Sequence, residues 1–246
     1  MIKASEIAKV FAKGNSIDKV YKGDEQIFPL DYIRDGLVLH FDGIDNEATG
    51  THNNDATKWI DLVGGIEATL TSVVWTDNGL TFSGNASRVT YNPLKGTASI
   101  PEYTITTVVK MRKLGTYPRM YGEQQFPSLY AHNVQSFQYS YYGQGSDVRF
   151  QPVQSISEDT EVLTIRKRAN SRLIELFKNG VVISSTTLAN NGQEAQWKAL
   201  QVLGNRDPDY ARGMWGTFND MKVYTVALSD EQIMRNYLVD KERYVE

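Results

Sequence analysis

One stretch of this sequence has the apolar spacing of an amphipathic helix, and it lies near the C-terminal end, over 228–244. Ser229 is a favourable N-cap, and Gln232, three residues later, completes a capping box. Apolar residues then recur four residues apart from Ile233 to Leu238, which predicts a face that can lie on a sheet. Ahead of this stretch the chain offers short strand-like runs separated by turns. Many strands with one late helix predict an all-β sandwich rather than an α/β fold.

The strand-like runs are rich in β-branched and aromatic residues, and clear examples occupy 36–41 and 103–110. The strongest local signal spans 172–187, where two apolar runs flank Asn179 and Gly180. Asn-Gly accepts the positive φ angles of a type I′ turn, so this segment predicts a β-hairpin. The chain's 14 Tyr, 9 Phe and 19 Gly fit the same fold class, because aromatic residues suit pleated strands and Gly suits turns.

Composition excludes several classes of function. The 246 residues include no cysteine, so disulfide frameworks, thiolate zinc sites and cysteine nucleophiles are ruled out. There are 26 Lys and Arg residues against 29 Asp and Glu, with no basic cluster. Nucleic acid is therefore not expected as a partner, because phosphate binding relies on concentrated positive charge. No run of 18 apolar residues occurs, and lysines interrupt the N-terminus, so neither a membrane span nor a signal peptide is expected.

Residues 1–30 differ from the rest of the chain. Lys-Val-Phe at 9–11 and Lys-Val-Tyr at 19–21 are each followed by Lys-Gly, which predicts two brief strand-turn units. Pro29 then interrupts the pattern. A segment of this length cannot bury a core of its own, so we expect a small β attachment segment that leans on another chain. The alternative is a pair of edge strands on the main domain, 31–246.

A family resemblance follows from the order of short motifs along the chain. The motifs are GLVLHFD at 36–42, WIDL at 59–62, GLTFSG at 79–84, YTI at 103–105, FKNGV at 177–181, WGTFNDMKVY at 215–224 and ALSDEQI at 227–233. In this order they resemble the LamG-like branch of the concanavalin A-like lectin and glucanase jelly rolls. The resemblance covers 36–246. It implies a two-sheet antiparallel jelly-roll sandwich over 31–246, with a small N-terminal β segment and one C-terminal helix.

The first thirty residues are similar to leader segments of bacteriophage virion proteins that carry a LamG-like domain. This similarity implies a non-catalytic virion structural protein, as a fibre, decoration or receptor-binding component whose jelly roll binds bacterial surface carbohydrate. It also implies localisation in the virion, contacts with other virion proteins through 1–30, and a homo-oligomer. The alternative is a carbohydrate-binding or adhesion module of the bacterial cell surface.

A glycan hydrolase is the third and least favoured function. Glucanases of this broad fold carry two carboxylates on one strand, typically as Glu-x-Asp-x-Glu, with one acting as nucleophile and the other as acid. No such triplet occurs here, and the acidic clusters at 42–47 and 158–161 read as loops. The three histidines, His40, His52 and His132, are scattered without a hydrolase pattern. The sequence therefore predicts that the protein is not an enzyme.

Eight aromatic residues between Tyr117 and Tyr142 suggest a carbohydrate site. If 136–142 is a strand, Gln138 and Tyr142 share one face, and the neighbouring strand would add Arg149 and Gln151 to it. A tyrosine ring offers apolar area to a sugar while its hydroxyl and nearby polar groups hydrogen-bond. These residues are the predicted carbohydrate-binding set. The alternative is packing of the aromatic rings between the sheets.

The same reasoning gives one predicted metal site. Asn205, Asp207 and Asp209 place oxygen side chains at alternate positions, which suits calcium. The acidic loop at 45–55 is a second candidate. Ordinary turn chemistry is the alternative in both places, since Asp and Asn bond to their own backbone and Pro fixes φ.

Overall fold

The computed structural model describes most of the sandwich and parts of the N-terminal segment. The described residues are 11–12, 15–16, 20–22, 25–28, 31–92, 100–112, 119–122, 128–131, 139–143, 146–150, 157–188, 201–204 and 213–245. Within these ranges, only the backbone is described for 11–28, 131, 139–147 and 201–202. In the described part of the chain no helix has the length and apolar character needed to cross a membrane.

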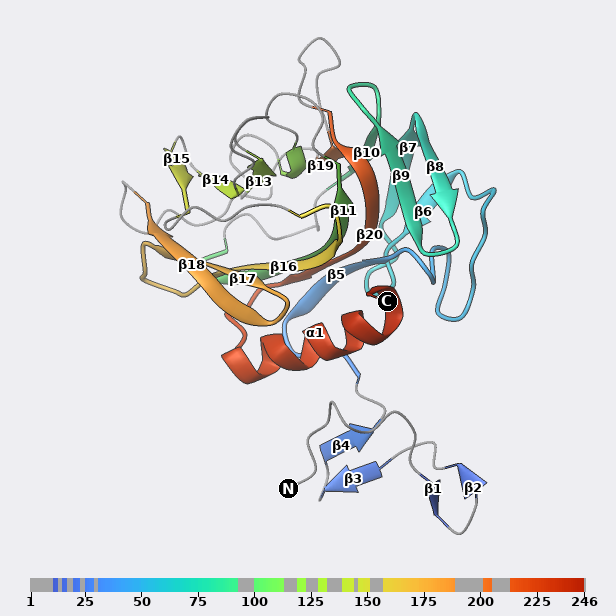
Figure 1. Cartoon of the computed structure of the whole chain (residues 1–246), viewed down its shortest axis with the longest axis horizontal. Helices are drawn as coiled ribbons and strands as arrows, with labels where there is room; N and C mark the ends of the chain where they lie inside the picture. The colour runs from blue at the N-terminus through green and yellow to red at the C-terminus, as the bar shows by residue number, and fades with distance from the viewer. Residues whose placement is uncertain are drawn as a thin grey trace.

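Two antiparallel sheets stack face to face, as Figure 1 shows. The first sheet has the order β15 (Ser146–Arg149), β14 (Tyr139–Gly143), β13 (Ser128–Ala131), β12 (Arg119–Tyr121), β19 (Gln201–Gly204), β10 (Arg88–Tyr91), β7 (Glu67–Thr71) and β6 (Lys58–Ile60). The second has the order β18 (Val181–Thr187), β17 (Leu173–Lys178), β16 (Thr160–Lys167), β11 (Tyr103–Met111), β20 (Trp215–Tyr224), β9 (Gly79–Ser83) and β8 (Val73–Thr76). Strand β5 (Leu37–Asp42) pairs with the C-terminal half of β20. The predicted two-sheet sandwich is confirmed.

The core lies between the sheets and follows from strand alternation. Phe41, Trp59, Phe82, Ile105 and Phe218 are all fully or almost fully buried there. The long strand β11 is buried on both faces over most of its length, because helix α1 (Asp230–Tyr244) covers the outer face of the second sheet. The second sheet therefore has three kinds of surface: the core, the part under α1, and the part beyond the end of α1.

The two local predictions from the sequence are confirmed. Asn179 and Gly180 have φ values of 52° and 78° and join β17 to β18 as a hairpin. At the start of α1, the Gln232 backbone N–H donates to the Ser229 hydroxyl over 3.2 Å. The Ser229 N–H donates to the Gln232 side chain over 2.8 Å, which completes the capping box.

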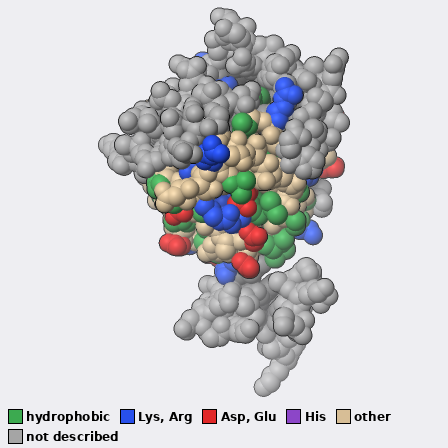
Figure 2. All heavy atoms as spheres, turned by 90° about the vertical axis from the view of Figure 1, so that its left-hand side faces the viewer, with side chains coloured by type: hydrophobic (Ala, Val, Ile, Leu, Met, Phe, Trp, Pro, Cys, Tyr) green, Lys and Arg blue, Asp and Glu red, His purple; other side chains and the backbone are tan. Residues whose placement is uncertain are grey.

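The edge strand β18 carries apolar side chains into solvent. Val181 and Val182 are 54% and 47% exposed. Figure 2 faces this side of the molecule, and there the apolar side chains lie among polar and charged ones. Scattered apolar exposure of this kind is normal for a soluble surface and does not mark a docking site.

The N-terminal segment forms two small hairpins. Strand β1 (Phe11–Ala12) pairs with β2 (Asn15–Ser16), and β3 (Val20–Lys22) pairs with β4 (Glu25–Phe28). Each hairpin is a separate two-stranded sheet that joins neither sheet of the sandwich. Strands β1 and β3 overlap the two Lys-Val-aromatic repeats at 9–11 and 19–21, where the sequence predicts strands. The attachment role of 1–30 stays a prediction.

Candidate functional site

Most of the residues predicted to bind sugar or calcium cannot be judged from the structure. Five of them lie outside the described residues: Gln138, Gln151, Asn205, Asp207 and Asp209. Tyr142 is in β14, where its backbone pairs with Ser128 and Asp147. Arg149 ends β15 opposite Ser140 and is exposed. The carbohydrate set and the calcium site remain predictions.

The acidic loop at 45–55 is held together by its own side chains. Asn46 is fully buried; its amide donates to the Asn53 carbonyl over 2.8 Å and accepts from the Asn53 N–H over 2.9 Å. The Asn53 side chain donates to Glu47 over 2.9 Å. These oxygens and amides fix the shape of the loop, as expected for Asn and Asp in turns. The arrangement supports the structural explanation of this loop rather than a calcium site.

A cluster of charges lies buried between α1 and the outer face of β5 and β20. Lys222 is fully buried, forms an ion pair with Asp220, and lies 2.8 Å from Asp240 of α1. Its ammonium group also lies 4.1 Å from the centre of the Tyr32 ring, whose hydroxyl donates to Asp240 over 2.8 Å. Burial raises the pKa of Asp240 to about 6, although Lys222 acts in the opposite direction. Lys222 thus joins the sheet to the helix.

Asp42 is the centre of the other half of this cluster. Arg243 donates to it over 2.5 Å and the Tyr244 hydroxyl over 2.7 Å, both from the last turn of α1. His40 Nε2 lies 3.6 Å from Asp42 and 2.8 Å from Asp220. Burial alone would raise the pKa of Asp42, but Arg243, His40 and the hydrogen bonds hold it at about 2. The sequence reading missed this cluster, because Asp42 and Asp220 are far apart in the chain.

The burial and ion pairs of this cluster fit a structural role. Ligand atoms of His40, Asp42 and Asp220 lie within 4.8 Å of one another, which is near the separation of the carboxylates in retaining glycosidases. However, all three side chains are buried, and Lys222 and Arg243 already contact the two carboxylates. Cations in these positions oppose a metal ion, and α1 closes the cluster to a substrate.

Beyond the C-terminal end of α1, the outer face of the second sheet is hollowed by two adjoining clefts. We call them together the outer-face groove. The larger cleft has a volume of about 450 Å³ and is lined by Thr76, Asn78, Lys110, Asp159, Thr160, Thr217, Asn219, Tyr244 and Val245. The smaller has a volume of about 270 Å³ and is lined by Thr81, Phe82, Ser83, Lys110, Arg112, Trp215, Gly216 and Thr217. Lys110 and Thr217 line both clefts, so the groove is continuous.

Strand register explains why polar side chains gather there. Lys110 pairs with Thr217, which pairs with Thr81, so these three form one outward row across β11, β20 and β9. Two positions along, the Arg112 N–H donates to the Trp215 carbonyl over 2.9 Å and extends the ladder. A second outward row therefore contains Arg112 and Trp215. The neighbouring residues of the same strands point inward to the core.

Trp215 forms the apolar part of the groove and is half-buried. Its ring lies against Gly84, where an added Cβ would come within 2.6 Å of an indole carbon. The next residue, Gly216, has a φ of 135°, and a Cβ there would lie 1.9 Å from the Lys110 carbonyl oxygen. Glycine at both positions lets the indole and the two strands approach this closely.

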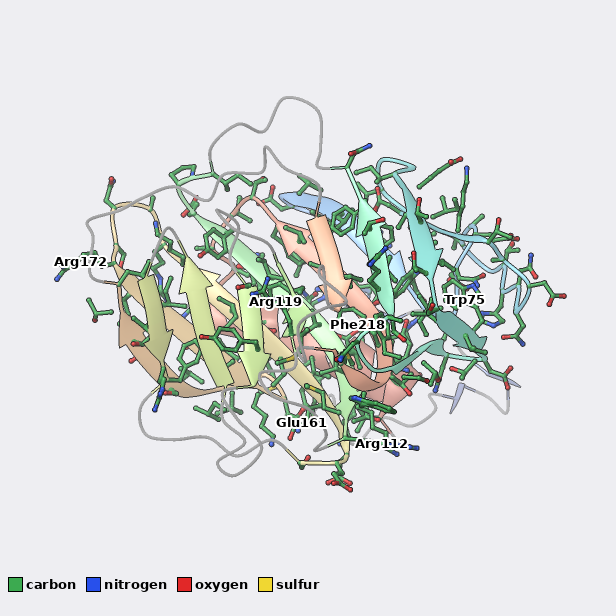
Figure 3. All side chains as sticks on the ribbon, turned by 90° about the horizontal axis from the view of Figure 1, so that it is seen from above. Trp75, Arg112, Arg119, Glu161, Arg172 and Phe218 are labelled. Atoms are coloured by element: carbon green, nitrogen blue, oxygen red, sulfur yellow. The ribbon has the colours of Figure 1, made fainter. Side chains whose placement is uncertain are left out.

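Several polar groups of the groove lack an ion-pair or hydrogen-bond partner among the described residues. Lys110 and Arg112 are exposed and make no ion pair with any described residue. Asn219 is only 3% exposed; its side-chain N–H donates to the Asn78 carbonyl over 2.8 Å. Its side-chain oxygen has no hydrogen-bond partner in the described part of the chain. Figure 3 labels Arg112 near one edge of the sandwich and Phe218, the neighbour of Thr217, towards its middle.

Comparisons with known proteins find similarity of fold. No protein-family model and no curated sequence matches the chain. Among solved structures, an HCR/D F1240A mutant superposes with a TM-score of 0.62 at 16% identity, over 85% of this chain and 53% of that chain. The ligand binding domain of botulinum neurotoxin serotype D, in complex with N-acetylneuraminic acid, gives a TM-score of 0.61 at 14% identity, over 83% of this chain and 51% of that one.

A Trypanosoma rangeli sialidase is also similar, with a TM-score of 0.57 at 16% identity, over 84% of this chain and 33% of that chain. This chain thus spans about half the length of the HCR/D mutant and of the neurotoxin ligand binding domain, and a third of the sialidase. At such low identity the likeness concerns the β-sandwich fold alone. It does not extend to the LamG-like family.

Proposed function

We propose that this protein is a non-catalytic carbohydrate-binding β-sandwich and that sugar binds in the outer-face groove. The observation that carries the proposal is the half-buried Trp215 beside the polar row of Lys110, Thr217 and Thr81. An aromatic ring covers the apolar face of a sugar, and nearby polar side chains hydrogen-bond to its hydroxyls. Two similar structures support the proposal: the neurotoxin serotype D ligand binding domain is in complex with N-acetylneuraminic acid, and a Trypanosoma rangeli sialidase is in complex with sialic acid.

The proposal includes binding without hydrolysis. Among the described residues that line the groove, Asp159 is the single carboxylate, whereas most glycosidase families use two. The two carboxylates that do lie close together, Asp42 and Asp220, are buried under α1. Neither arrangement offers a sugar an acid and a nucleophile.

At a finer level we propose the virion role: a fibre, decoration or receptor-binding component with a LamG-like jelly roll that meets bacterial surface carbohydrate. Support comes from the two hairpins in 1–30, which stand apart from both sheets and suit attachment to other virion proteins. A carbohydrate-binding module of the bacterial cell surface is the alternative. Localisation in the virion and homo-oligomer formation are parts of the same hypothesis.

A glycan array followed by titration of the full chain tests the proposed function. We expect Trp215→Ala to abolish binding of the best array ligand and Tyr142→Ala to leave it intact, with near-native melting temperatures for both variants. Loss of binding in Tyr142→Ala alone would move the site to the first sheet. Absence of binding to every glycan on the array would overturn the proposed function.

Two additions to the titration test the remaining hypotheses. No reducing ends should appear when the bound glycan is incubated with the protein; release that disappears on replacing one Asp or Glu would contradict a non-catalytic role. Titration with and without a calcium chelator tests the predicted site at Asn205, Asp207 and Asp209.

A further inference from the structure

Two cations that have no acidic partner among the described residues lie in the smaller cleft of the groove. Lys110 and Arg112 stand two positions apart on the same outer face, one in each outward row. Two other cations of this sheet do have carboxylate partners: Lys178 pairs with Glu161, and Arg166 pairs with Glu175. Two like charges that share a cleft repel each other, and an anion placed between them removes that cost.

The larger cleft, which Lys110 also lines, adds a carboxylate and a buried hydrogen-bond acceptor. Asp159 is exposed at its rim and repels an anion. The buried Asn219 presents a side-chain oxygen that lacks a donor. A buried acceptor without a partner is costly, and a hydroxyl or N–H group of a ligand satisfies it. The groove thus has a cationic end, where Arg112 lies beside Trp215. At its other end, the Asn219 oxygen requires a hydrogen-bond donor from the ligand.

We propose that the ligand of the groove is an acidic oligosaccharide, whose carboxylate lies between Lys110 and Arg112 while a neutral, hydroxyl-rich unit reaches Asn219. This inference rests on the proposed carbohydrate-binding function. The ring of the acidic unit packs on Trp215. The charge difference between the two ends sets the direction in which the saccharide lies, because the reversed orientation brings its carboxylate to Asp159.

The test uses an array that prints tetragalacturonate beside its methyl ester, and 3′-sialyllactose beside lactose. We expect the carboxylated member of at least one pair to bind at least about tenfold more tightly, since hydrogen bonds to charged groups are roughly twice as strong as neutral ones. For that ligand, Lys110→Gln and Arg112→Gln should each weaken binding by about tenfold, and the affinity should fall as salt rises.

The matched control is Lys58→Gln, which removes an exposed lysine from the first sheet, away from both clefts, and should leave affinity unchanged. A different outcome is that neutral glycans bind in a Trp215-dependent way, and that their affinity changes neither with salt nor with Lys110→Gln or Arg112→Gln. This outcome would overturn the acidic ligand while leaving the proposed function intact. An equal loss of affinity in Lys58→Gln and Arg112→Gln would also overturn it. Binding to no glycan overturns both proposals.

Discussion

Replacing Lys222 by methionine tests what holds α1 on the second sheet. Methionine nearly matches the length of the lysine stem, so the substitution removes the charge with little change in volume. It leaves Asp220 and Asp240, both fully buried, without the cation that contacts them. It also removes the ammonium group from the face of the Tyr32 ring.

The expected cost is about 3–5 kcal/mol of unfolding free energy, which is typical of a buried ion pair that loses one partner. Protonation of Asp240 keeps the cost within this range. Its pKa is already about 6, and removal of Lys222 raises it further, so the carboxyl group binds a proton at neutral pH instead of staying charged. The remaining cost comes from Asp220, whose side chain then keeps only His40 as a partner among the described residues.

Urea unfolding at pH 7 followed by tryptophan fluorescence measures this cost. Lys58→Met is the matched control, because Lys58 forms an ion pair with Glu67 on the surface. This variant should lose no more than about 1 kcal/mol of unfolding free energy. The double variant Lys222→Met/Asp240→Asn removes both charges and should be more stable than Lys222→Met alone. If Lys222→Met costs no more than Lys58→Met, the buried charges do not hold the helix.

Three further predictions concern the same fold. The pKa of Asp240 is about 6 in the folded protein and 3.8 ordinarily, so the folded state binds the proton more tightly than the unfolded state. The unfolding free energy should therefore rise as the pH falls from 6.5 towards 4. Asp240→Asn should flatten this rise when urea unfolding is measured at each pH. Ser229→Ala should lower the unfolding free energy by about 1 kcal/mol, because the capping box is lost. Ser157→Ala is not a neutral control for this variant, because the Ser157 hydroxyl donates a hydrogen bond to Glu161. A chain beginning at Asp31 should keep a melting temperature close to that of the full chain yet fail to enter particles or oligomers; aggregation or a melting temperature many degrees lower would assign 1–30 to the sandwich.

Local structure was predictable because its causes are local in sequence. The turn at Asn179 and Gly180 needs two neighbouring residues that accept positive φ, and these residues form it. The start of α1 needs Ser229 and Gln232, three positions apart, and both of their hydrogen bonds are present. The many short strand-like runs with a single late helix similarly indicated the sandwich.

The outer-face groove was not predictable in this way. Thr81, Lys110 and Thr217 come from three distant parts of the chain and meet only through the order β9, β20 and β11. Sequence reasoning turned instead to the aromatic density near Tyr142, a signal visible within one segment. Trp215 was visible as part of a family-like motif, but its neighbours across the sheet were not.

The buried charges are also contributed by distant segments, and a second reason hid them; they bear on the groove as well. His40 and Asp42 alternate with core residues along β5, a pattern that ordinarily predicts a solvent-facing side of a sheet. Helix α1 covers that side, and its own Asp240 and Arg243 complete the charges there. The last turn of α1 is fixed by the Tyr244 hydroxyl bonded to Asp42, and Tyr244 also lines the larger cleft. The ion pairs under the helix therefore determine where the helix ends, and that end forms one wall of the groove.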